Sequence, residues 1–170
     1  MRELLIGAGH RRVKELTVND SKKFENLTTL DINEYCADVV WDLNNRPLPF
    51  DDETFDEIHA YEILEHVGRL GDAVGFFEEW AEYWRILKPL GVFCGSCPKW
   101  DSYIAWCDPS HSRIITPHTL KFLDQNYIKE KIDSGTNMSD FRNIWKLNFN
   151  LVYLNEDASD DKFYFILQKV

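Results

Sequence analysis

The sequence is poor in the residues that mark several classes of protein. Its 170 residues include only 4 cysteines, irregularly spaced at Cys36, Cys94, Cys97 and Cys107. That number is too small for a disulfide framework in a chain of this length, so a reducing, cytoplasmic setting is expected. Apolar runs are short and none approaches the roughly 18 residues of a membrane span. The first of them reaches Gly7 too early to be a signal peptide.

Positive charge is also scarce. Lysine and arginine total 19 against 29 aspartates and glutamates, which gives a formal net charge of −10. A negative surface repels phosphate backbones and disfavours non-specific nucleic-acid binding. Apolar residues make up 44% and aromatic residues 14% of the chain, which is enough for a substantial core and excludes a disordered protein. Repeats and linkers are absent, so we expect a single domain over residues 1–170.

The order of apolar segments predicts an α/β fold. Strands are expected over residues 3–6, 27–32, 39–42 and 55–61 and again from residue 91. Between the last two strands, apolar residues recur at helical spacing and predict a helix over 71–87. By contrast, His10 to Asn26 has no such periodicity, so helical cover is expected to be thin there.

The second half of the chain predicts a loop, a helix and a hairpin. Residues 99–115 form a loop long enough to act as a functional loop or lid. Thr116 followed by proline predicts a helix N-terminus, and the helix is expected to run to about Asn126. Segments 149–154 and 163–170 flank an acidic turn and predict an antiparallel hairpin.

Glycines and carboxylates stand at the C-terminal ends of the predicted strands, where α/β sheets bind ligands. Gly7 and Gly9 would let the backbone approach a ligand closely. Asp31 ends the second strand, where a carboxylate can accept both hydroxyls of a ribose. Asp42 ends the third strand and could accept the exocyclic amine of adenine. Together these residues predict a pocket for an adenosine group.

This adenosine ligand is expected to carry no phosphates. A dinucleotide site requires G-x-G-x-x-G, and here Arg12 stands in the place of the third glycine. The chain also contains no Gly-Lys-Ser/Thr triplet, which excludes a P-loop.

On these residues the sequence resembles the class I S-adenosylmethionine-dependent methyltransferases. The resemblance covers essentially the whole chain and is carried by LLIGAGH, LTTLDIN, DVVWDLNNRPLPFDDETFDEIHAYEILEHV and FFEEWAEYWRILKPLGVF. It implies a Rossmann-like, mostly parallel seven-stranded sheet with a C-terminal antiparallel hairpin, and S-adenosylmethionine as cofactor. The cofactor-binding residues that it implies are Gly7, Gly9, His10, Asp31, Ile32, Asp42, Leu43, Tyr61 and Glu62.

The sequence departs from the family pattern around the first strand. Leu5 stands where the family has an acidic residue, and His10-Arg11-Arg12 occupies the glycine turn. No segment corresponds to the helix that precedes this strand in the family. We therefore expect a cofactor site that is open or completed by a second subunit in a homo-oligomer. The alternative function is a catalytically inactive S-adenosylmethionine-binding or interaction protein that retains the fold.

Three residues are candidates for chemistry on the acceptor. His66 follows the fourth strand, near where a substrate would enter, while Asp108 and His111 lie in the loop that the resemblance places near the acceptor pocket. Imidazole or carboxylate could take a proton from a nucleophile. A structural role is an open alternative, since His66 could cap a short helix and Asp108 to His111 could form a hydrogen-bonded turn.

The acceptor class follows from what the fourth strand lacks. Methyltransferases of the family that act on base amino groups carry Asn/Asp-Pro-Pro-Tyr there, whereas this chain has Tyr61-Glu62-Ile63-Leu64. With the acidic charge, this favours a small-molecule or protein acceptor over nucleic acid.

The cysteines offer a rival site. Cys94 and Cys97 have C-x-x-C spacing and could form a zinc site with Cys107 and His111. Cysteines at the end of a buried strand commonly pack as small apolar residues, so no metal site is predicted.

Overall fold

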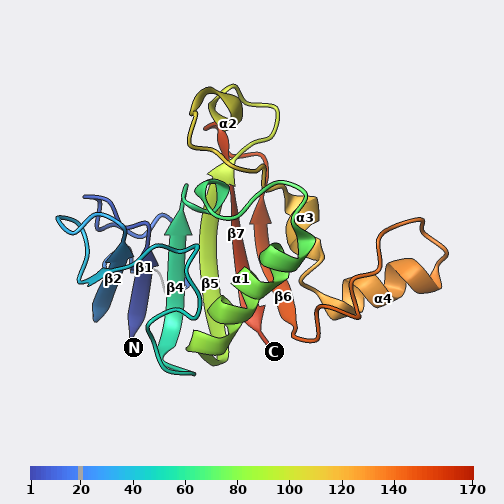
Figure 1. The fold of residues 1–170 in the computed structure, drawn as a ribbon, viewed down its shortest axis with the longest axis horizontal. Coiled ribbons are helices and arrows are strands. Elements are labelled where there is room, and N and C mark those ends of the chain that lie inside the picture. The colour runs from blue at the N-terminus through green and yellow to red at the C-terminus, as the bar shows by residue number, and fades with distance from the viewer. Residues whose placement is uncertain (19–20) are drawn as a thin grey trace.

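The computed structural model describes residues 1–18 and 21–170, whose strands form one seven-stranded sheet in the order β3-β2-β1-β4-β5-β7-β6 (Figure 1). Strands β1 to β5 run parallel, and β7 lies antiparallel between β5 and β6. This confirms the predicted mostly parallel sheet with a C-terminal antiparallel hairpin. The strands are β1 Glu3–Ile6, β2 Leu27–Asp31, β3 Val39–Val40, β4 Phe55–Tyr61, β5 Leu87–Pro98, β6 Phe149–Asn155 and β7 Lys162–Lys169.

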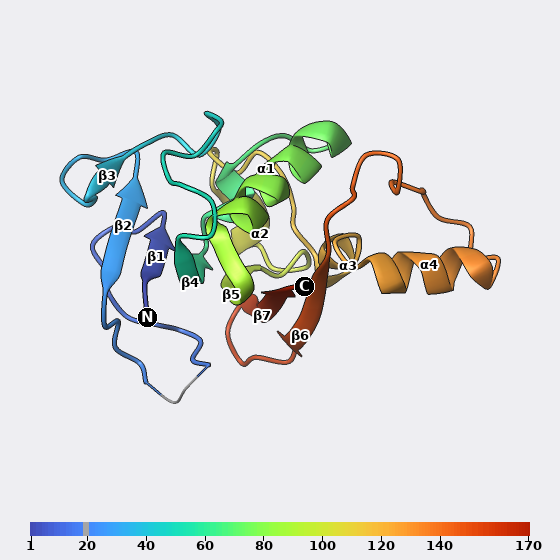
Figure 2. The same cartoon turned by 90° about the horizontal axis from the view of Figure 1, so that it is seen from below.

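One face of the sheet is covered by α1, as Figures 1 and 2 show. The Asp72 carboxylate accepts a 2.9 Å hydrogen bond from the Gly75 amide and so caps the helix N-terminus. Trp80 of this helix is fully buried, and its ring lies 4.9 Å from that of Phe93 on β5. The helices are η1 Leu64–His66, α1 Ala73–Ile86, α2 Ile104–Cys107, α3 Pro117–Lys121 and α4 Gln125–Asp133. Among the described residues, none of them is long and apolar enough to cross a bilayer.

The prediction of a single helix from Thr116 to about Asn126 is wrong. The Thr116 cap is confirmed, but α3 ends at Lys121 and α4 begins anew after Asp124. The Asp124 carboxylate accepts the amides of Asn126 and Tyr127, which satisfies a new helix N-terminus instead of continuing the old helix. In Figure 1, α4 projects away from the sheet.

The opposite face of the sheet carries both polar and apolar side chains and is covered without a helix in the described part of the β1–β2 connection. Leu16 packs against the cluster of Val92, Cys94 and Ile166 on β5 and β7, and the Phe24 ring lies 5.1 Å from that of His59 on β4. Residues 10–18 and 21–26 contain no helix, in agreement with the thin helical cover expected there, while Asn19 and Asp20 lie outside the described residues.

Buried charge attaches this connection to the sheet. The Lys14 side chain has no solvent exposure, and its ammonium bonds to the carboxylates of Glu3 and Glu57, the latter at 2.8 Å. Glu57, His59 and Tyr61 alternate along β4 and so share one face. His59 Nε2 lies 2.9 Å from Glu57, and His59 Nδ1 lies 2.7 Å from the Tyr61 hydroxyl. Through Lys14, this network attaches the segment that follows the β1 turn to strands β1 and β4.

Candidate functional site

Two cavities of about 210 Å³ each meet at Gly7, beyond the C-terminal end of β1. The nucleoside cavity is lined by Gly7, Asp31, Ile32, Trp41, Asp42, Leu43, Asn44, Ile63, His66 and Val67. The glycine-turn cavity is lined by Leu5, Gly7, Ala8, Gly9, His10, Arg11, Val13, Glu15, Tyr61 and Glu62. Every residue that the sequence predicts to bind the cofactor therefore lines one of these two cavities.

Asp31 and Asp42 are both half-buried and line the same cavity. The two oxygens of Asp31 each accept one backbone amide, from Gly9 and Asn33, at 2.9 Å. One oxygen of Asp42 accepts the Asn44 amide at 2.8 Å. A carboxylate has about four acceptor positions, so both side chains keep capacity for ligand hydroxyl or amine groups.

The glycine turn is built for close approach. Gly7 has φ +61°, and a Cβ atom there would lie 2.3 Å from Cγ1 of Ile63. Arg12, in the place of the family's third glycine, donates to the carbonyls of Gly9 at 3.0 Å and Ala8 at 3.3 Å, and also to that of Cys36. A guanidinium thus holds the turn where the family pattern has a glycine.

Tyr61 and Glu62 close the glycine-turn cavity. The Tyr61 hydroxyl accepts the Leu16 amide at 3.2 Å, and burial raises the pKa of its phenol. Glu62 has φ +52° and forms a 2.8 Å ion pair with Lys162 of β7. The cavity therefore has a partly neutralised carboxylate at its edge.

The structure brings the predicted catalytic residues together. The rings of His66 and His111 lie 4.7 Å apart edge to face. The Ser110 hydroxyl lies 2.5 Å from Oδ1 of Asp108 and 3.0 Å from Nδ1 of His66. An ionised carboxylate only accepts, so Ser110 donates to Asp108 and accepts from the Nδ1–H of His66. This tautomer leaves a lone pair on Nε2 of His66, and His66 is one of the residues that line the nucleoside cavity.

Glu65 was not predicted from the sequence. Its side chain is 2% exposed, and neither carboxylate oxygen has a hydrogen-bond partner among the described residues. Burial raises its pKa to about 7. Its one signal in the sequence is its place directly before His66 in a short apolar turn.

The loop over 99–115 lies beyond the C-terminal ends of β4 and β5 and contains α2 (Figure 1). Its ends are bound to the body of the protein. Lys99 Nζ donates to the Ala158 carbonyl at 2.7 Å, and the Ser112 amide donates to the Glu65 carbonyl at 2.9 Å. These bonds hold His111 beside His66.

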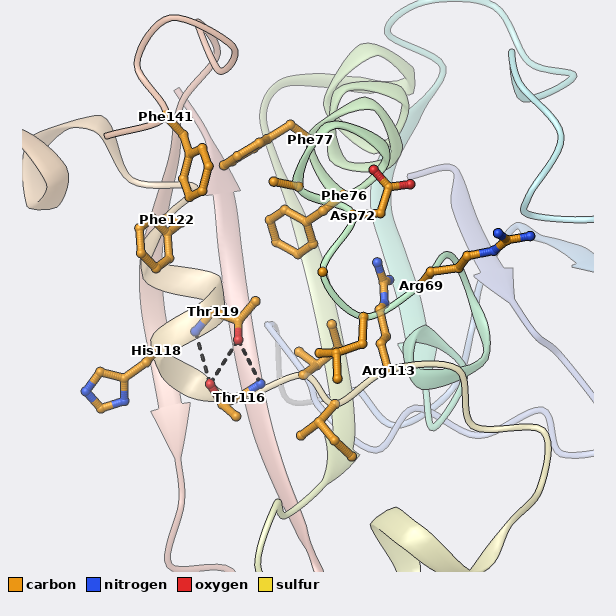
Figure 3. A pocket seen from close by; sticks show the side chains of 15 residues that line it. Arg69, Asp72, Phe76, Phe77, Arg113, Thr116, His118, Thr119, Phe122 and Phe141 are labelled. Carbon is orange, nitrogen blue, oxygen red and sulfur yellow. Dashed lines mark hydrogen bonds between the residues drawn. The ribbon is translucent and has the colours of Figure 1, made fainter. Parts of the chain in front are cut away.

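A third cavity of about 400 Å³ lies between the start of α1 and α3. Figure 3 shows Phe76, Phe77, Phe122 and Phe141 around it. Arg113 lines it too, but its guanidinium is bound to Glu79 at 2.8 Å and to a backbone carbonyl. This aromatic cavity shares no lining residue with the other two and offers room for an apolar group.

The cysteines do not assemble. Cys97 packs in the main core, whereas Cys94 packs on the opposite face with Val92 and Ile166. Cys107 is exposed on α2. Because Cys94 and Cys97 point to opposite faces of the sheet, they cannot share a zinc ion, and burial raises the pKa of both thiols.

Comparisons with known proteins bear on the fold. No protein-family model matches the chain, and no curated protein matches its sequence. Among solved structures, it is similar to a SAM-dependent methyltransferase from Archaeoglobus fulgidus, with 17% identity over 99% of this chain and 86% of that one and a TM-score of 0.59. A chain of the Haloferax volcanii complex between a methyltransferase activator and a methyltransferase has 16% identity over 99% and 82%, with a TM-score of 0.56. The N-methyltransferase NodS from Bradyrhizobium japonicum has 13% identity over 99% and 85%, with a TM-score of 0.53. The chain therefore has the fold of the class I SAM-dependent methyltransferases.

Proposed function

We propose that this protein binds S-adenosylmethionine and transfers its methyl group to a small-molecule or protein acceptor. The observation that carries the proposal is that Asp31 and Asp42 line one cavity, which meets the glycine-turn cavity at Gly7. In this arrangement Asp31 would hold the ribose hydroxyls and Asp42 the adenine amine.

The charges around the cavities support this ligand. Neither lysine nor arginine is among the described residues that line the nucleoside cavity, as expected for a nucleoside without phosphates. The glycine-turn cavity is lined by residues of both signs, Arg11 with Glu15 and Glu62. That mixture suits the carboxylate and ammonium groups of a methionine moiety.

When bound, the cofactor would supply an electrophilic methyl group on a sulfonium. The work of the protein is then to hold the reacting groups in line. Nε2 of His66 would take a proton from an acceptor, and the His111 ring lies beside that of His66. Asp108 acts through Ser110 on the His66 tautomer, which makes it a positioning residue.

Calorimetric titration with S-adenosylmethionine and S-adenosylhomocysteine tests the binding site. Asp31→Asn and Asp42→Asn each remove one charged acceptor, worth about 1.5–3 kcal/mol, so each should weaken binding by about tenfold to a hundredfold. Asp101→Asn, in an exposed position outside the cavities, is the matched control and should bind like wild type. Equal affinity of all three variants, with unchanged melting temperatures, would remove the basis of the proposal.

A second candidate is a cofactor-binding protein without turnover. Arg12, bound to the carbonyls of the turn, replaces the family's third glycine and favours this reading. Release of S-adenosylhomocysteine in a screen of acceptors separates the two functions. An enzyme should release it with at least one acceptor and lose most of that rate in His66→Gln while still binding cofactor. The methyltransferase–activator complex of the Haloferax relative supports including candidate partner proteins in the screen.

A further inference from the structure

We infer that Glu65, His66 and His111 form a binding site for a divalent transition-metal ion of the Zn²⁺ class. A carboxylate oxygen of Glu65 and one nitrogen from each imidazole lie within 4.8 Å of one another. Such a spacing lets all three side chains reach one ion with small rotations. The inference rests on these side chains and not on cofactor binding. An ion bound to Nε2 of His66 would occupy the lone pair proposed above as the proton acceptor, so His66 serves one role or the other in a given molecule.

The hydrogen bonds fix both imidazoles as acceptors. His66 donates its Nδ1–H to the Ser110 hydroxyl, whose own proton is donated to Asp108. Nδ1 of His111 lies 3.0 Å from the Ala105 carbonyl, which only accepts, so this nitrogen also carries the proton. Both rings therefore keep a free lone pair on Nε2. Metal-ligating histidines show this pattern, with the second ring nitrogen bonded to a carbonyl or a polar side chain.

Glu65 adds an unpartnered carboxylate. It is 2% exposed, and both oxygens lack a hydrogen-bond partner among the described residues. Arg113 is the buried cation in this region, but its guanidinium bonds to Glu79 and the Leu64 carbonyl. The described hydrogen bonds thus leave both Glu65 oxygens and one nitrogen of each imidazole without a donor, and a bound cation would satisfy them.

A second carboxylate–histidine cluster shows what such a group looks like when its cation is part of the chain. Glu3, Glu57 and His59 also have ligand atoms within 4.8 Å of one another. There the Lys14 ammonium bonds to both glutamates, so the cluster already contains its positive charge. The cluster at Glu65 has no equivalent lysine among the described residues.

The donor set indicates the class of ion. Two imidazoles and one carboxylate suit Zn²⁺, Fe²⁺, Co²⁺ or Ni²⁺, whereas Mg²⁺ and Ca²⁺ prefer oxygen ligands. Three protein ligands leave at least one coordination position open to water or a substrate. His66 also lines the nucleoside cavity, so an ion here would lie beside that cavity.

The test is a titration of the full chain, freed of metal by a chelator, with Zn²⁺ in competition with a chromophoric chelator. Wild type should bind one ion at this site. His66→Gln and His111→Gln should each weaken that binding by at least about a hundredfold, and Ser110→Ala by about tenfold to a hundredfold because it removes an outer partner of a ligand. Glu65→Gln keeps the size of the side chain but removes a ligand, so it should weaken Zn²⁺ binding as much as the two histidine variants do.

Two controls separate this site from adventitious binding. Cys107→Ser removes the exposed thiol and His118→Gln an exposed imidazole outside the cluster, and both should bind like wild type. The absorption spectrum of the Co²⁺ form should show no thiolate charge-transfer band. Unchanged Zn²⁺ affinity in His66→Gln and His111→Gln, or binding lost in Cys107→Ser, would overturn the inference. Absence of binding by wild type would also overturn it, while leaving cofactor binding untouched.

Discussion

Among single residues, Lys14 illustrates how this fold depends on a buried charge. Its ammonium is buried between Glu3 and Glu57, and desolvation of three charges is offset only while all remain paired. Its pKa is raised, because the two carboxylates outweigh the opposing effect of burial. The ion therefore stays charged at any ordinary pH.

We predict that Lys14→Met lowers the free energy of unfolding by about 3–5 kcal/mol, because it leaves two buried carboxylates without their cation. Lys129→Met is the matched control, since Lys129 pairs with Asp133 at the exposed surface and such pairs contribute about 0–1 kcal/mol. Urea denaturation followed by fluorescence measures both variants. Similar decreases in the free energy of unfolding in the two variants would show that the buried ion pairs stabilise the protein no more than an exposed pair does.

His59 gives the network a pH dependence. Burial is the main cause that lowers the pKa of its imidazole, opposed by Glu57 and Glu3 and assisted by Lys14. The tyrosine hydroxyl and the Cys94 thiol also lie near it, and both are neutral. The unfolded chain therefore takes up this proton first, and the native state loses stability as pH falls below about 6.5. The lowered pKa of Glu57 continues the loss below about 4.5.

The expected result is that the unfolding free energy of wild type falls more steeply between pH 7 and pH 5 than that of His59→Gln. Comparing the two slopes cancels contributions from other groups, such as Glu65, whose raised pKa acts in the opposite direction. Chemical denaturation at a series of pH values provides the slopes. Parallel curves would contradict a neutral buried imidazole at this position.

Among the structural elements, the turn after β1 shapes the site, because both cavities are lined by Gly7 in this turn. Its backbone takes φ +61° at Gly7 while Ile63 packs directly against that Cα. The sequence identified this turn correctly because glycine has few other reasons to follow a buried strand. It could not identify Ile63 as the neighbour, because that contact joins residues from two different strand ends.

Gly7→Ala should therefore cost more than backbone strain alone. A left-handed alanine costs about 1–2 kcal/mol, and forcing Cβ against Ile63 adds about 1–3 kcal/mol. Gly135 has φ +76° with open space around it, so Gly135→Ala should lose only the stability that the backbone strain costs. Thermal unfolding of the two variants compares them directly, and equal losses would mean that Ile63 moves aside freely.

Element boundaries were predicted best where a local signal fixed them. The strand over 55–61 and the cap at Thr116 follow from apolar patterning and a side-chain bond within one turn. The break before α4 was not predicted because Asp124 can either continue a helix or cap a new one, and here it caps α4. That outcome depends on packing elsewhere, which a local pattern does not contain.

For the whole molecule, the parallel strands explain why the location of the site could be predicted from the sequence although the side-chain contacts within it could not. The C-terminal ends of neighbouring parallel strands meet at one edge of the sheet, so Gly7, Asp31 and Asp42, which end or closely follow β1, β2 and β3, come together there. Glu65 and Lys14 were missed because burial, which makes them unusual, is a property of the folded chain.

The position at which S-adenosylhomocysteine binds tests the proposed cofactor site most directly. A titration of ¹⁵N-labelled protein, followed by amide chemical shifts, reports this residue by residue. We expect the largest shifts to cluster at Gly7, Gly9, Asp31 and Asp42. Shifts centred instead on Phe76 and Phe122, or no shifts at saturating ligand, would contradict this expectation.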